Sequence, residues 1–213
     1  MHQGSQGASS PLVGIALKVV SVAVFVGMST AIKATGEVPA GQIVFYRSFF
    51  AIFPILVFLA FRRELGTAFV TRRPFGHVMR GLVGVMAMGF GFFALTQLPL
   101  PEAITLNYAQ PLLVVVFSAL FLGENVRMYR WTAVAIGLVG VVIVSWPKLT
   151  LFTSGAGLGD KAAIGVVAAL VSASLSAIAM LLVRNLVHTE RTATIVLWFS
   201  LSASAMALLT IPF

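Results

Sequence analysis

The chain has 213 residues, of which 59% are hydrophobic and only 9% are charged, and its mean hydropathy is +1.03. Soluble domains carry about 25% charged residues, so this composition excludes an ordinary soluble globular protein. The net charge of +8 is of the kind that nucleic-acid binders carry, but most Lys and Arg residues lie in short loops between apolar segments, which favours a membrane protein. The absence of cysteine excludes disulfides and thiolate metal sites.

Seven apolar segments follow a polar N-terminal tail. Each is close to the roughly 20 residues that a helix needs to cross a hydrocarbon core of about 30 Å. We therefore predict an all-α polytopic membrane protein, with residues 1–11 as a cytoplasmic tail and the uncleaved first span as the insertion signal. The predicted spans are 12–34, 40–61, 76–97, 102–122, 130–146, 162–183 and 192–212.

The first span carries a stripe of residues on one helix face, namely Lys18, Ser21, Phe25, Ser29 and Lys33. Two interpretations are open. Either the stripe lines a substrate pathway, with Lys18 and Ser29 as its polar groups, or Lys18 extends along the lipid to the cytoplasmic interface.

The second span holds Arg47, about 10 Å from its predicted outer end. An Arg at a helix centre costs about 2.5–3.5 kcal/mol on insertion scales, so such residues usually face the protein interior and mark pathways. Extension of Arg47 to the outer interface is the alternative. Tyr46 is a weaker pathway candidate. Pro54 frees the carbonyl of Phe50, and we assign it a conformational role.

The third span contains Gly81, Gly84, Gly89 and Gly91, whose expected role is close helix packing. No pair of carboxylates in the sequence shares a helix face, and no glycine-rich phosphate loop follows a strand. We therefore expect no enzyme activity, no cofactor and no metal site. No Asp, Glu or His is predicted deep in a span, so ion coupling is either absent or located in spans outside this chain.

The fourth span carries Asn107, Gln110 and Pro111 on one helix face near its middle. Pro111 has no N–H, so the carbonyl of Asn107 loses its usual helix partner. Two amides and a free carbonyl are costly in lipid unless they meet protein or water. One interpretation is a water-filled substrate cavity, with Tyr108 at its edge. The other is a kink satisfied by hydrogen bonds between helices.

The loops predict the orientation of the chain. Those after spans two, four and six hold nine Lys or Arg residues, and those after spans one, three and five hold three. This bias places the N-terminus and the even-numbered loops in the cytoplasm. The nine are Arg62, Arg63, Arg72, Arg73, Arg80, Arg127, Arg130, Arg184 and Arg191; the three are Lys33, Lys148 and Lys161.

The sequence also contains a weak internal repeat. At an offset of 152, the segment IVFYRS (43–48) falls on IVLWFS (195–200), and the first and sixth spans agree at 151. Because the offset covers five spans, the second copy enters the membrane from the opposite side, which is typical of secondary transporters. We predict a five-span repeat over 12–147, an external linker over 148–161, and two spans of an incomplete second repeat over 162–213. In the sixth span, the hydroxyl of Ser172 is expected to bond its own helix.

These motifs resemble the drug/metabolite transporter superfamily, and specifically its EamA-type members. The similar stretches are VPAGQIVFYRSFFA (38–51), PEAITLNYAQPLLVVVFSALFLGE (101–124) and GLVGVVIV (137–144). The resemblance implies ten spans in two inverted repeats around a central cavity, in a bacterial inner membrane. It further implies cavity or gate positions at Arg47, Asn107, Gln110 and Pro111, and a conformational or topological role for Glu124.

The sequence therefore predicts a secondary transporter that moves small polar metabolites by alternating access, as an exporter of amino acids or related carboxylate or zwitterionic solutes. An importer of a cofactor-like solute such as S-adenosylmethionine or riboflavin is the alternative within this class. A non-transporting membrane accessory subunit is the alternative outside it. The expected partners are the small-molecule substrate and the lipid bilayer, without nucleic acid, and a homodimer is left open.

Overall fold

The computed structural model describes residues 11–34, 38–149 and 161–209, and every regular element in these ranges is a helix. The predicted all-α class is therefore confirmed. Most of the predicted tail and linker, and the end of the seventh predicted span, lie outside the described residues. The helices are α1 (Pro11–Ala34), α2 (Ala40–Phe61), α3 (Leu65–Ala68), α4 (Pro74–Gln97), α5 (Leu100–Asn107), α6 (Ala109–Leu122), α7 (Met128–Leu149), α8 (Lys161–Val187) and α9 (Thr192–Leu208).

Each predicted span corresponds to a helix, except that the fourth is divided into α5 and α6. Five stretches are long and apolar enough to cross a membrane, counting α5 and α6 as one, and two shorter apolar stretches lie in α7 and α9. The chain is thus a multi-pass membrane protein. The short α3 lies in the loop after α2, where no helix was predicted.

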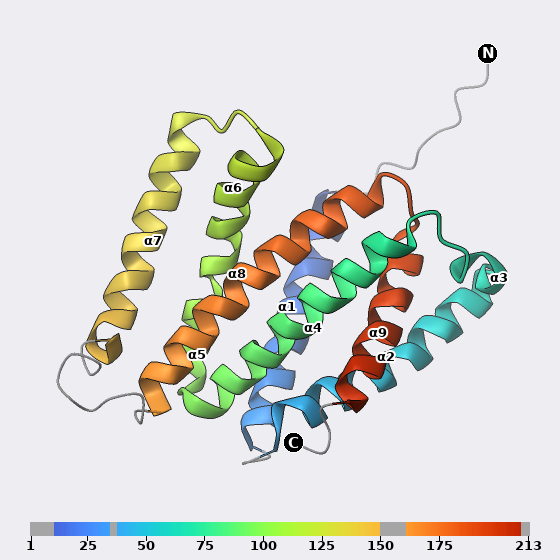
Figure 1. Ribbon diagram of the computed structural model, residues 1–213, viewed down its shortest axis with the longest axis horizontal. Coiled ribbons are helices and arrows are strands. Elements are labelled where there is room, and N and C mark those ends of the chain that lie inside the picture. Colours follow the sequence, from blue (N-terminus) through green and yellow to red (C-terminus); the bar gives the residue numbers. More distant parts are fainter. Residues whose placement is uncertain (1–10, 35–37, 150–160, 210–213) are drawn as a thin grey trace. The chain divides into compact units, whose positions relative to one another are not determined.

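The helices form two compact units, residues 1–36 with α1 and residues 37–213 with all the others. In the second unit, α4 and α8 lie side by side (Figure 1). On one side α8 packs against α5 and α6, and α7 packs against α6. On the other side α4 packs against α9, which in turn packs along α2.

Small residues bring α4 and α8 close together. A Cβ added at Gly91 would lie 2.9 Å from the Oγ of Ser172, and one added at Gly165 would lie 2.8 Å from the Cγ of Leu98. The predicted packing role of the α4 glycines therefore holds for Gly91. The Ser172 hydroxyl donates to the carbonyl of Ala87 on α4 at 2.7 Å, so the expectation that it bonds its own helix was wrong. The reason is that small residues of α4 let the two helices approach closely, so the carbonyl of Ala87 lies within reach of the Ser172 hydroxyl.

The loops after α2 and α8 are bound together at one end of the bundle, which we call the even-loop end (residues 62–73, 123–127 and 188–191). The carboxylate of Glu190 accepts hydrogen bonds from the hydroxyl of Thr71 at 2.8 Å and from the backbone N–H groups of Arg72 at 2.7 Å and Arg73 at 3.2 Å. Arg191 lies 3.5 Å from the carboxylate of Glu64. These contacts hold the two loops together at the same end of the helix bundle.

Candidate functional site

The fourth span is broken where the sequence predicted a helix irregularity. α5 ends at Asn107 and α6 begins at Ala109, with Tyr108 between them. The N–H of Tyr108 donates to the carbonyl of Thr105 at 3.1 Å, a tighter turn than that of an α-helix. Pro111 lies in the first turn of α6, where its missing N–H is tolerated. The proline therefore begins a new helix.

Two carboxamides lie at this break. The side chains of Asn107 and Gln110 are half-buried, and neither forms a hydrogen bond with another part of the described chain. Tyr108 is 62% exposed. Both α5 and α6 pack against α8, so the break lies beside the small-residue surface of that helix.

Arg47 is an exposed side chain within the apolar helix α2, two positions of which, Val44 and Ser48, are buried. Its guanidinium carbon lies 5.7 Å from the centre of the Phe92 ring on α4, close enough for a cation–π contact. No carboxylate among the described residues pairs with it. The neighbouring Tyr46 is 56% exposed and stacks with Phe50.

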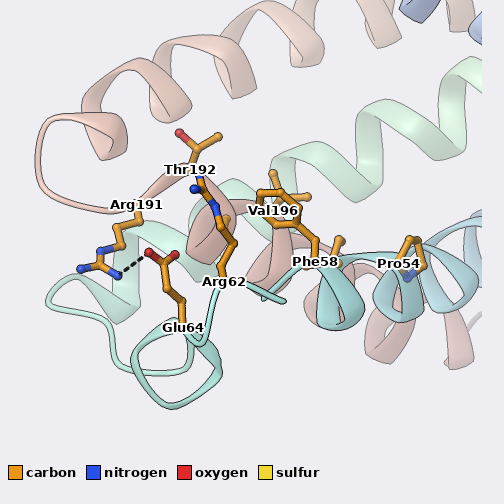
Figure 2. Close-up of a pocket in the computed structure, with 9 residues that line it drawn as sticks. Pro54, Phe58, Arg62, Glu64, Arg191, Thr192 and Val196 are labelled. Atoms are coloured by element: carbon orange, nitrogen blue, oxygen red, sulfur yellow. Dashed lines mark ion pairs between the residues drawn. The ribbon is translucent and has the colours of Figure 1, made fainter. Parts of the chain in front are cut away.

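The other predicted site residues lie elsewhere. Lys18 and Ser29 belong to α1, where the Ser29 hydroxyl donates to the carbonyl of Phe25 on its own helix. Pro54 lines a groove between α2 and α9 (Figure 2). Glu124 follows the left-handed Gly123 that ends α6, and its carboxylate pairs with Arg184 of α8 at 2.5 Å. The hydrogen bond from Arg184 holds the pKa of Glu124 below its ordinary value.

The structure brings these candidates into two groups. Arg47 lies on α2, which packs against α9 and α4, whereas Gln110 lies on α6, which packs against α8 and α7. Each group therefore has its own helix neighbours within residues 37–213. A single site that includes both remains a prediction.

Sequence reasoning missed a buried polar cluster between α4 and α9. His77 is 1% exposed and its ring lies 5.7 Å from that of Trp198, while the guanidinium of Arg80 lies 4.2 Å from the Phe199 ring. The count of loop charges includes Arg80, but Arg80 lies within the predicted span 76–97 and inside α4. The sequence signal is the position of Arg80 six residues after Pro74, the first residue of the helix. No group of three metal-ligating side chains occurs within the described ranges.

Several relatives of this chain are membrane transporters. The pseudopaline exporter CntI of Pseudomonas aeruginosa is 30% identical over 92% of this chain and 65% of its own length. The S-adenosylmethionine uptake transporter of Rickettsia prowazekii is 31% identical over 50% of this chain and 35% of its own length. The riboflavin transporter of Rhizobium johnstonii is 30% identical over 75% of this chain and 49% of its own length. No solved structure matches the chain.

The family comparison covers most of the described helices. The chain spans less than two thirds of the length of these relatives. The model of the EamA-like transporter family matches residues 12–146, a range that includes Arg47, both carboxamides and the break at Tyr108. The resemblance noted in the sequence is thereby confirmed, and the chain belongs to the EamA-like transporter family.

Proposed function

We propose that this chain is part of a secondary transporter that moves small polar solutes carrying at least one negative group, with amino acids and related carboxylates as the substrate class. The observation that carries the proposal is the guanidinium of Arg47. It lies within an apolar membrane helix, against an aromatic ring and without a carboxylate partner in the described chain.

An unpaired guanidinium is costly at membrane depth, and a side chain of this kind is usually retained for contact with a solute or an ion. Because Arg presents a planar fork of N–H donors, it suits a carboxylate better than a point charge would. The Phe92 ring stabilises the cation without neutralising it. A solute carboxylate would therefore supply the charge that the described residues do not.

The broken fourth span supports the same proposal. Asn107 and Gln110 carry donor and acceptor groups that the described protein leaves free, beside a helix break that also leaves the carbonyl of Asn107 without its N–H partner. Broken helices at membrane depth recur where a transporter binds its solute. We propose Tyr108 and Pro111 as further pathway positions, with weaker assignments for Lys18, Ser29 and Tyr46.

Alternating access requires contacts that break and re-form at each end of the protein. We propose that the ion pair and hydrogen bonds of the even-loop end act in this way, because they join loops that are distant in sequence, as in the bond between Glu190 and Thr71. We propose that Glu124 and Pro54 act in this conformational change. We also propose that the even-loop end and the N-terminus face the cytoplasm of a bacterium, in its inner membrane, as the distribution of Arg suggests.

Export is the direction we favour, because the relative matched over 92% of this chain is an exporter. The uptake of S-adenosylmethionine by another relative makes import of a cofactor-like solute the second candidate. Both directions use the same pathway, since the gradient of the solute decides the net flux.

The test is counterflow of labelled amino acids in liposomes that contain the complete protein. Arg47→Ala should reduce uptake of the labelled solute by at least about tenfold, the effect of losing roughly 1.4 kcal/mol of solute binding. Arg127→Ala is the matched control, because Arg127 is exposed in a loop. Equal activity of both variants and of the wild type, with any anionic or zwitterionic solute, would contradict the proposal.

A further inference from the structure

The second unit contains a groove of about 710 Å³ between the end of α2 and the start of α9. The residues that line it include Pro54, Phe58, Arg62, Glu64, Arg191 and Val196. Figure 2 shows the charged side chains gathered at one end of the groove, with Phe58, Val196 and Pro54 farther along it. The groove is therefore charged at one end and apolar along the rest of its length.

The charged end lies where the membrane helices end. Arg62 directly follows α2 and Arg191 directly precedes α9, so both guanidinium groups lie at the even-loop end of the bundle. From Arg62 the groove runs along α2 to Pro54, about 12 Å at the helical rise of 1.5 Å per residue. The apolar part thus enters the hydrocarbon layer from the interface.

The charges at the charged end of the groove do not cancel. Glu64 pairs with Arg191 at 3.5 Å; the Arg191 side chain is largely exposed and that of Glu64 is partly buried. The guanidinium of Arg62 lies 5.5 Å from the centre of the Phe58 ring, a contact that leaves its positive charge in place. Two cations and one anion leave a surplus positive charge at the end of the apolar part of the groove.

We propose that this groove binds one anionic phospholipid from the leaflet at the even-loop end. The lipid phosphate contacts Arg62 and Arg191, and an acyl chain lies along Phe58, Val196 and Pro54. An anionic headgroup matches the surplus charge, and the apolar wall matches the chain. Basic pockets between membrane helices at this depth suit acidic lipid headgroups. The site is separate from Arg47, and the proposal does not depend on the solute transported.

The test uses the complete protein in mixed micelles with equal amounts of phosphatidylglycerol and phosphatidylcholine, and native mass spectrometry to count the lipids retained. Wild-type protein should retain one phosphatidylglycerol in preference to phosphatidylcholine. Arg62→Gln should weaken this binding roughly fivefold, the effect of about one Arg near a membrane surface. Arg127→Gln makes the same change of charge outside the groove and should retain the lipid.

A second pair of variants acts in the opposite direction. Glu64→Gln removes the carboxylate that competes for Arg191 and should strengthen phosphatidylglycerol binding severalfold. Glu102→Gln removes one negative charge at the start of α5, away from the groove, and should leave phosphatidylglycerol binding unchanged. Val196→Trp fills the apolar part without altering charge and should displace the lipid.

Three results would overturn the proposal: no preference for phosphatidylglycerol in the wild type, equal binding by the Arg62 and Arg127 variants, or weaker binding after Glu64→Gln. A fourth combination would also overturn it: inorganic phosphate displaces the lipid, and Val196→Trp has no effect on lipid binding. The site would then bind phosphate alone. A gain on Glu64→Gln cannot arise from misfolding.

Discussion

The carboxylate of Glu190 accepts a hydrogen bond from the hydroxyl of Thr71 at 2.8 Å, although the two residues lie 119 positions apart. The same oxygen accepts the backbone N–H groups of Arg72 and Arg73, and it lies 4.0 Å from Nε2 of the buried His77. One side chain from the loop after α8 thus orders the backbone that leads into α4. We call this set of contacts, made by Glu190 with Thr71, Arg72 and Arg73, the latch.

Loss of the charge on Glu190 should loosen this loop. In Glu190→Gln a neutral amide replaces the carboxylate, and hydrogen bonds to charged groups contribute about 1.5–3 kcal/mol against about 1 for neutral ones. Hydrogen exchange at the amides of Arg72 and Arg73 should therefore accelerate by roughly three- to tenfold. Thr71→Ser keeps the hydroxyl and is the control. Unchanged exchange in Glu190→Gln would show that the latch contributes nothing.

The latch should respond to acid in a defined direction. Burial opposes ionisation of Glu190, but the hydrogen bonds from Thr71 and Arg72 outweigh it and hold the pKa below its ordinary value. A carboxyl with a lowered folded-state pKa stabilises the protein above its unfolded-state pKa of about 4.3, and this contribution disappears as the pH falls through the folded-state pKa.

The midpoint of thermal unfolding in detergent measures this contribution. The difference between wild type and Glu190→Gln should be constant from about pH 8 to pH 6 and should shrink below the ordinary range of a carboxyl, near pH 4. A difference that vanished between pH 7 and pH 6 would contradict the assignment, because it would point to a histidine.

Local patterns predicted the helices well and the contacts between them poorly. The apolar runs set the spans, and Pro111 placed the irregularity near Tyr108, because both effects depend on residues close in sequence. The bond from Glu190 to Thr71 and that from Ser172 to Ala87 join distant segments, so no local period encodes them. Arg80 lies within the predicted third span, but its contact with Phe199 on α9 likewise joins distant segments.

The two glycines near the end of α4 allow a matched test of packing. Gly91→Ala would place a Cβ 2.9 Å from the Ser172 Oγ and disturb its bond to Ala87, whereas a Cβ at Gly89 has nothing within 4 Å. Overpacking costs about 1–3 kcal/mol, so Gly91→Ala should lower the thermal midpoint. Gly89→Ala should leave it unchanged or raise it slightly, because Ala favours the helix. Equal effects would contradict the close approach of α4 and α8.

Single cysteines can test the membrane sidedness, since residues 1–213 contain no cysteine. A membrane-impermeant thiol reagent should give the same result for Arg72→Cys and Arg127→Cys, because the loops after α2 and α6 both belong to the even-loop end. It should give the opposite result for Lys161→Cys at the start of α8. Labelling of Arg72→Cys from outside the cell would reverse the proposed orientation, and different results for Arg72→Cys and Arg127→Cys would contradict the helix topology.

The break in the fourth span is the feature that most directly links fold and proposed function. Pro111→Ala restores an N–H that can reach the carbonyl of Asn107, so α5 and α6 should join into one helix. The side chains of Asn107 and Gln110 should then turn together with that helix. Transport should fall by at least tenfold while the protein stays folded, since Ala fits a helix at this position and supplies the N–H that proline lacks. The control is Pro101→Ala, because Pro101 lies in the first turn of α5, where a missing N–H has little effect.

Spin labels at Glu102 and Leu120 would report the straightening of the fourth span as a longer distance between the two labels. If that distance increased and transport stayed intact, the break would be a structural kink and Asn107 and Gln110 would not belong to the pathway.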